Sequence, residues 1–314
     1  MDNDHGHQLP LWEGTEDRRG AGSRHGLNET RLREQLEDAG LVRVADAVID
    51  LARPSVGLYT ISRSEVEIPA GTSKTGGSPD LPPAIAWPEW KGRPLSFVAQ
   101  LNLAEVVPHA PPQILPTTGI LYFFYDVVDS PWGFDPKDRG GWRVFYSNED
   151  VAALERRPLP LALVEPDQLW FTPCILGFSR ELTPPSWFSE RLGQVDLNQE
   201  EQNWYSEWWF DLKEKQAPVH RLLGAPYLIQ GDIMDLECQL ASNGVYLGDG
   251  KAYEDVQYDH LRSGASDWQL LLQLDSDETA EMMWGDSGMI YYWMRHQDLQ
   301  ALDFSATWLV LQCY

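Results

Sequence analysis

The chain has 314 residues, of which 43% are hydrophobic, enough for one large domain or two ordinary ones around a packed core. Its 48 acidic and 24 basic residues give a formal net charge of -24, which repels phosphate backbones and excludes nucleic acid as an expected partner. The three cysteines form no CxxC pair, and residues 1–10 lack the apolar stretch of a secretory signal. We therefore expect a cytoplasmic protein that does not contact a membrane.

The first residues, 1–26, are rich in Gly, His, Asp and Arg and show little periodicity, which predicts a flexible arm. Asn28 is a suitable N-cap for a helix over residues 29–39, and a second helix is predicted over residues 42–53. We expect residues 27–314 to form a single domain built from two related halves, over about 55–195 and 196–314.

Runs of apolar, aromatic and β-branched residues predict a sheet-rich core. The predicted strands cover residues 56–62, 65–68, 95–103, 119–125, 141–146, 168–175 and 307–311. Between them, residues 76–94 contain too many Pro and Gly residues for regular structure. The expected fold class is α+β, with internally duplicated, mostly antiparallel sheets and flanking helices.

A third helix is predicted from about Asn198 to Lys215. Asn198 and Glu201 have the spacing of a capping box, and Lys213 and Lys215 stand near the negative end of the helix. This helix carries four aromatic rings on two neighbouring faces, more than one core-facing stripe needs. The sequence leaves open whether this helix packs inward or faces solvent.

One strand pattern occurs twice. Gln100 lies in the apolar run FVAQLN, and Gln273 lies in the run LLLQLDSD. Each run is followed by a glycine and an aromatic strand, beginning at Gly119 and at Gly288. A buried amide must find hydrogen-bond partners, so we interpret both Gln residues as structural, with a polar cleft between the halves as the alternative.

These repeated residues resemble the YwqG-like family of bacterial proteins. The similarity extends over about residues 55–314 and is carried by the segments 73–77, 87–88, 95–103, 270–277 and 284–288. The resemblance implies a compact α+β fold with an internal duplication, and it implies no known reaction. The N-terminal arm and the aromatic helix match the family less clearly.

Motifs for catalysis are weak. The sequence Gly285-Asp286-Ser287-Gly288 looks like a protease nucleophile motif, but no histidine stands in a recognisable triad motif, and a turn between strands explains it better. Asp275, Asp277 and Asp286 are weak candidate ligands for a hard cation, without the spacing of an EF-hand. We expect no cofactor, and an enzyme is the less favoured class.

Charge and aromatic content favour a protein that binds another protein. Residues 196–314 hold 6 basic and 21 acidic residues, a net charge of -15, against 18 and 27, or -9, in residues 1–195. The candidate partner-binding residues are all on the predicted third helix: Glu200, Glu201, Trp204, Glu207, Trp208 and Asp211.

The sequence therefore predicts a non-enzymatic inhibitor that binds a basic protein. The expected example is a cytoplasmic immunity protein that neutralises a basic bacterial toxin, such as a nuclease effector. The alternative is an enzyme, or a small-ligand or metal-binding protein, with its site in the cleft between the two repeats.

Overall fold

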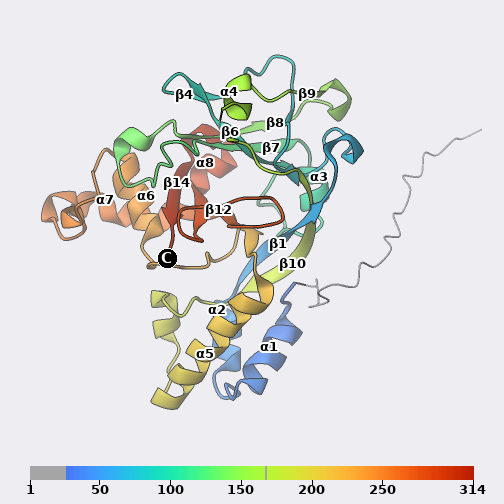
Figure 1. The fold of residues 1–314 in the computed structure, drawn as a ribbon. Helices are drawn as coiled ribbons and strands as arrows, with labels where there is room; N and C mark the ends of the chain where they lie inside the picture. The colour runs from blue at the N-terminus through green and yellow to red at the C-terminus, as the bar shows by residue number, and fades with distance from the viewer. Residues whose placement is uncertain (1–25, 167) are drawn as a thin grey trace, which may run out of the picture.

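A computed structural model of the protein describes residues 26–166 and 168–314 (Figure 1). The predicted arm, residues 1–26, lies outside the described residues apart from Gly26. Helices and strands are mixed along the chain. The α-helices are α1 (Glu29–Asp38), α2 (Ala45–Leu51), α3 (Leu103–Val106), α4 (Leu161–Val164), α5 (Gln199–Gln216), α6 (Met234–Ser242), α7 (Asp259–Arg262) and α8 (His296–Gln300).

The centre of the molecule is a 10-stranded sheet with the order β14-β13-β12-β11-β1-β10-β2-β6-β7-β8. All its neighbouring strands pair antiparallel, which confirms the predicted sheet type. Its strands are β1 (Arg53–Ser62), β2 (Lys74–Thr75), β6 (Ser96–Asn102), β7 (Ile120–Tyr125), β8 (Trp142–Ser147), β10 (Cys174–Thr183), β11 (His220–Leu222), β12 (Trp268–Asp275), β13 (Met289–Arg295) and β14 (Trp308–Gln312). Two short pairs lie outside it, namely β3 (Asp80–Leu81) with β9 (Glu155–Arg156) and β4 (Glu89–Trp90) with β5 (Arg93–Pro94).

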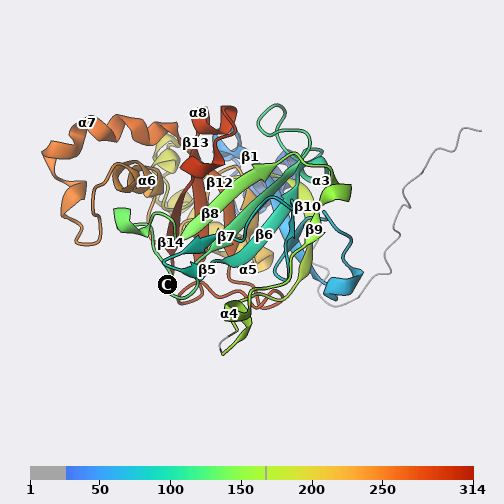
Figure 2. The same ribbon diagram turned by 90° about the horizontal axis from the view of Figure 1, so that it is seen from above.

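The two ends of this sheet curl toward each other into a nearly closed, barrel-like shape (Figure 2). The rings of Phe123 on β7 and Tyr292 on β13 lie 5.1 Å apart, edge to face. Trp142 on β8 contacts Trp308 on β14 at 5.0 Å, and its indole N–H donates to the carbonyl oxygen of Thr307. Such aromatic contacts bury large apolar areas, so part of the main core lies between the two ends of the sheet.

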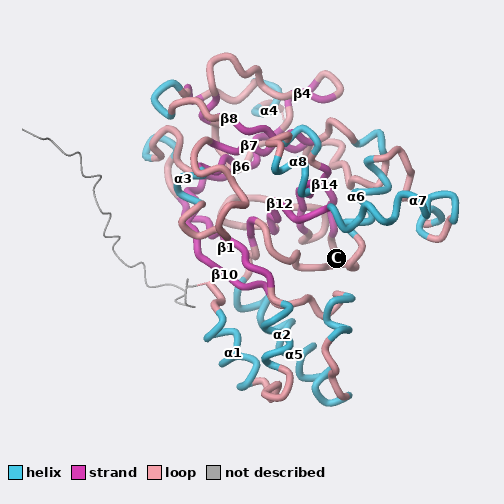
Figure 3. Tube along the Cα trace, turned by 180° about the vertical axis from the view of Figure 1, so that it is seen from behind, coloured by secondary structure: helices cyan, strands magenta, loops and turns pink. Residues whose placement is uncertain are grey.

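The long pair β1 and β10 joins this barrel to a group of helices. The two strands pair over ten residues, from Arg53 opposite Thr183 to Ser62 opposite Cys174. Helices α1, α2 and α5 gather at one end of the pair, below the barrel in Figure 1 and again in the view from behind (Figure 3). Helices that are far apart in sequence therefore lie side by side there.

The predicted third helix forms as α5. Its capping box is confirmed, because the Asn198 side chain accepts from the Glu201 amide at 3.0 Å and Glu201 Oε2 accepts from the Asn198 amide at 2.9 Å. Most of its aromatic residues point inward. Tyr205, Trp208 and Trp209 are buried, so packing rather than solvent contact explains most of this aromatic content.

Three predicted elements are wrong or misplaced. Residues 65–68 form a 3-10 helix, Glu65–Glu67, instead of a strand, because the Glu65 carboxylate accepts from Lys74 Nζ and from the Ser78 amide and holds the chain off the sheet. The strand predicted over 168–175 begins only at Cys174, after Pro173, and continues to Thr183. The second helix ends at Leu51 because Arg53 already belongs to β1.

Candidate functional site

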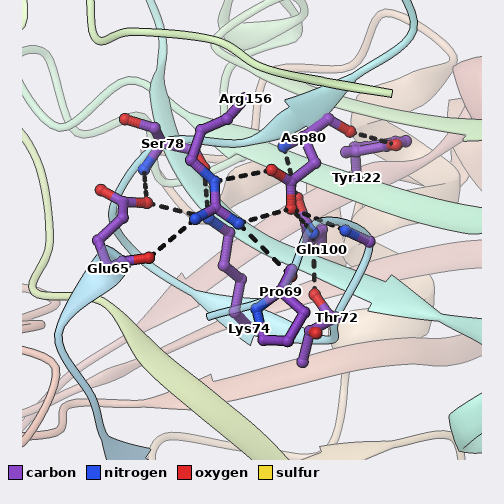
Figure 4. Close-up of polar contacts among 10 residues, drawn as sticks. Glu65, Pro69, Thr72, Lys74, Ser78, Asp80, Gln100, Tyr122 and Arg156 are labelled. Atoms are coloured by element: carbon purple, nitrogen blue, oxygen red, sulfur yellow. Dashed lines mark hydrogen bonds and ion pairs between the residues drawn. The ribbon is translucent and has the colours of Figure 1, made fainter. Parts of the chain in front are cut away.

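Gln100, the glutamine of the first repeated pattern, lies in a buried polar network (Figure 4). Its Oε1 accepts from the Asp80 amide at 2.8 Å, and its Nε2 donates to Thr72 O and to Asp80 Oδ2, both at 2.8 Å. The Tyr122 hydroxyl, from the paired strand β7, donates to the Asp80 carbonyl at 2.7 Å. The glutamine therefore holds Thr72, just before β2, and Asp80, on β3, against the sheet, in agreement with its structural interpretation.

Two cations complete this first network. Lys74, fully buried on β2, donates to Glu65 Oε1 at 3.0 Å and to the carbonyl of Ser78. Burial lowers the pKa of the Lys74 ammonium, and the carboxylates of Asp80 and Glu65 oppose that shift. Burial alone would raise the pKa of Asp80, but hydrogen bonds from Arg156 and attraction by Lys74 bring it below the ordinary value.

The second glutamine makes the corresponding backbone contacts in the other arm of the sheet. Gln273 Oε1 accepts from the Tyr227 amide at 2.7 Å, and its Nε2 donates to Val219 O at 2.7 Å. The Tyr291 hydroxyl, from the paired strand β13, donates to the Tyr227 carbonyl at 2.6 Å. Arg221 stands where Lys74 stands in the first network, opposite the glutamine, and donates to the Ala225 carbonyl at 2.9 Å.

Both glutamines thus bond to backbone groups of neighbouring segments, and Gln100 also donates to the Asp80 carboxylate. Removing such a partner would leave buried donors and acceptors unsatisfied, at a cost of about 1–3 kcal/mol each. We interpret the two networks as structural supports. They are not an open site, because their carboxylates and amides already have protein partners.

The weak metal candidates do not form a metal site. Asp275 accepts from the Val219 amide, and Asp277 accepts from the Thr60 hydroxyl and from His220, while Asp286 is exposed. Within residues 26–166 and 168–314, no group of three or more His, Cys, Asp or Glu side chains could hold a metal ion.

His220 and Asp277 form a buried pair beside β1. The Asp275 amide donates to His220 Nδ1 at 3.0 Å, so the proton of the neutral ring lies on Nε2, which faces Asp277 Oδ2 at 3.2 Å. Burial would raise the pKa of Asp277, but hydrogen bonds from His220 and Thr60 outweigh it and lower that pKa to about 2. Nearby, burial and the Asp277 charge raise the pKa of the Cys174 thiol to about 12, which makes it a poor nucleophile.

The structure separates the six candidate partner-binding residues into two sets. Glu201 is 4% exposed and its carboxylate is held by Arg43, with Nε to Oε1 at 2.8 Å, while Trp208 is 9% exposed. Glu201 supports the helix from inside, and Trp208 is largely buried at the floor of the groove described below. Glu200, Glu207 and Asp211 are exposed, and Trp204 is partly buried.

Two of the exposed residues line a groove of about 800 Å³ between α1 and α5. Glu207 and Asp211 stand on the α5 side, and Glu34 and Asp38, also exposed, stand on the α1 side. Arg31 and Lys215 are the cations in the lining, and Lys215 Nζ lies 3.5 Å from Asp211 Oδ2. The groove also has apolar lining residues, among them Leu27, Ala39, Trp204, Trp208 and Leu212.

Sequence reasoning did not select the α1 side of this groove. The signal was present, since Glu34 and Asp38 are four residues apart and therefore on one face of a helix. A second and larger groove, about 1040 Å³, was also not anticipated. It lies along β1 and β10 and is lined by Tyr59, Phe178 and His109 among others.

Fold and site together define a mixed α and β protein with a barrel-like antiparallel sheet and an acidic groove between two helices. Residues 73–313 match the family model of a domain of unknown function (DUF1963), so the chain belongs to that family. The match includes α5, the second polar network and Gln100, but it begins after α1 and after Glu65 and Thr72 of the first network. None of the curated proteins compared with the chain matches it significantly. In the described part of the chain, no helix is both long and apolar enough to cross a membrane.

Proposed function

We propose that this protein is a non-enzymatic inhibitor that binds a basic protein partner at the groove between α1 and α5. The observation that carries the proposal is the convergence of four exposed carboxylates, those of Glu34, Asp38, Glu207 and Asp211, on one groove with apolar lining. Complementary charge speeds the encounter of two proteins, and tryptophan beneath a charged rim supplies contact area.

The partner class that fits best is a bacterial toxin with a cationic active surface, such as a nuclease effector. A nuclease holds its substrate through contacts with phosphates, so it needs lysine and arginine at its active site. Carboxylates that occupy these positions would exclude the nucleic acid. In this proposal the protein is an immunity protein of the cytoplasm, and its net charge of -24 accelerates capture.

The test is co-purification from the native host, followed by an activity assay of the captured protein. We expect a stoichiometric basic partner whose nuclease activity is lost in the complex and returns on dissociation. The double variant Glu207→Lys, Asp211→Lys should weaken this complex at least about ten-fold, because both rim carboxylates then repel the partner.

The matched control is the double variant Glu149→Lys, Glu254→Lys. Both residues are exposed carboxylates outside the groove, and the control makes the same change in net charge. A partner that keeps full activity while bound would refute the inhibitor function. Equal affinity of the two double variants would refute the groove as its site.

A second candidate function, binding of a small ligand, is favoured by the groove of about 1040 Å³ along β1 and β10. Apolar and aromatic lining with a few polar groups is typical of ligand sites. Ligand-observed NMR with a set of small aromatic compounds tests it. Binding should be lost on Phe178→Ala, which removes part of the lining, and kept on Phe188→Ala, which lies outside it. Compounds that bind both variants equally would exclude the site.

We also propose that the two polar networks derive from an internal duplication, as in the YwqG-like family that the sequence resembles. The support is the matched position of Lys74 and Arg221 opposite Gln100 and Gln273. The strand orders β2-β6-β7-β8 and β11-β12-β13-β14 also mirror each other about the central pair. Equal losses of stability in Gln100→Leu and Gln273→Leu would agree with equivalent roles, whereas a loss in only one would contradict them.

A further inference from the structure

We propose that the partner inserts one cationic amphipathic helix into the groove between α1 and α5. This inference rests on the inhibitor function proposed above and specifies the element of the partner that is recognised. It follows from the arrangement of charge along the two helices, from the apolar lining between them, and from their lengths.

The four rim carboxylates form two pairs with helical spacing. Glu34 and Asp38 are four residues apart on α1, and Glu207 and Asp211 are four residues apart on α5. Like charges at this spacing repel each other and weaken a helix, and on α5 the exposed ion pair of Asp211 with Lys215 offsets part of that repulsion. Lysine or arginine residues of a partner placed beside each pair would neutralise the carboxylates and replace their repulsion by attraction to the partner.

The spacing of the carboxylates fits a helix better than an extended chain. Residues four apart on a helix are separated by about 6 Å along the axis, and a partner helix with basic residues at the same interval matches them one to one. The 10 residues of α1 and the 18 of α5 extend for about 15 and 27 Å, so both helices can flank between two and three turns of a partner helix.

The lining between the two charged rows is suited to the apolar face of such a helix. Trp204 is only partly buried and Gly40, at the end of α1, lies against its ring, so α1 and α5 meet at that end of the groove. Leu27 and Leu212 line the groove as well. An amphipathic helix in an apolar groove is a frequent mode of recognition between proteins.

Titration calorimetry with a synthetic peptide tests the proposal. The probe is a three-heptad peptide with leucine at positions a and d and lysine at b, c, e and g, so that lysines stand four residues apart on each side of the leucine stripe. Its control has the same composition in an order without an apolar face. The full-length protein should bind the amphipathic peptide at least about ten-fold more tightly than the control, because only the former presents a leucine stripe to the groove.

The variant Glu34→Gln, Asp38→Gln, Glu207→Gln, Asp211→Gln should lose at least about ten-fold in affinity for the amphipathic peptide. Its melting temperature should stay close to that of the wild type, because two repulsive pairs are removed together with the exposed Asp211–Lys215 ion pair. The control variant Glu67→Gln, Glu89→Gln, Glu149→Gln, Glu254→Gln neutralises the same number of exposed carboxylates outside the groove and should keep the affinity.

Equal affinity for the two peptides would refute the proposal that the groove binds an amphipathic helix. It would not refute the inhibitor function, because a partner could contact Glu207 and Asp211 through another element. A preference for the amphipathic peptide that survives in the groove variant would place the binding elsewhere and overturn the proposal. If only the inhibitor function is wrong, the captured partner stays active in the complex, while calorimetry still shows tighter binding of the amphipathic peptide than of its control.

Discussion

Glu237 on α6 should make the protein less stable as the pH rises through neutrality. The residue is 5% exposed, its carboxyl accepts one hydrogen bond from the Tyr253 hydroxyl at 2.9 Å, and its Oε2 has no partner among the described residues. Burial, together with the charge of the nearby Asp235, raises the pKa of this carboxyl to about 7, against the opposing effect of the Tyr253 hydrogen bond. An ionised carboxylate is therefore poorly tolerated at this position.

The sign follows from linkage between protonation and folding. Because the pKa of Glu237 in the folded state lies above its unfolded value of 4.5, the folded protein retains a proton that the unfolded chain releases. Its favourable contribution is fully present below pH 4.5 and is lost as the pH rises to about 7. At 1.36 kcal/mol per pH unit, the whole loss is about 3 kcal/mol.

The assay is the free energy of unfolding by urea at pH 5 and at pH 8, for the wild type and for Glu237→Gln. The amide keeps the shape of the side chain and cannot ionise, so the variant should gain about 2–3 kcal/mol relative to wild type between the two pH values. Glu254→Gln, at an exposed position, is the control. Parallel curves for the wild type and Glu237→Gln would refute the reasoning.

Three further predictions concern stability. Gln273→Leu should lower the free energy of unfolding by about 3 kcal/mol in urea titrations, because the Tyr227 amide and a backbone carbonyl lose their partner; a change below 1 kcal/mol would contradict this. Asp277, with its pKa lowered to about 2, should contribute stability above pH 3.8 that is lost as the pH falls through 2, so Asp277→Asn should flatten the acid limb of the unfolding curve. Gly133→Ala should destabilise the protein by at least about 2 kcal/mol, since its Cβ would lie 1.9 Å from a carbonyl oxygen of β14. Gly92→Ala is the control and should cost less, because Gly92 also has a positive φ but its Cβ would lie in open space. Equal melting temperatures of the two variants would refute the steric argument.

The sequence by itself determined the elements whose signals are local. The capping box of Asn198 and Glu201 positioned the start of α5, and continuous apolar runs identified β6, β7 and β12. The buried glutamines were interpreted correctly as hydrogen-bonded, because an amide in an apolar strand has few other options. Helix caps and strand propensity depend on residues that are close together in the sequence, so the sequence alone was sufficient to predict these elements.

Tertiary structure alone decided which of the chosen side chains reach the surface. Glu201 turns inward because Arg43, 158 residues earlier in the chain, binds its carboxylate, and no periodicity within α5 reveals that partner. The strand β10 could not be assigned beyond Ile175, since Gly177 and Ser179 weaken its pattern and its ten-residue pairing with β1 supplies the missing stabilisation. The acidic groove is of the same kind: its two carboxylate pairs are visible in the sequence, but only the packing of α1 beside α5 brings them together.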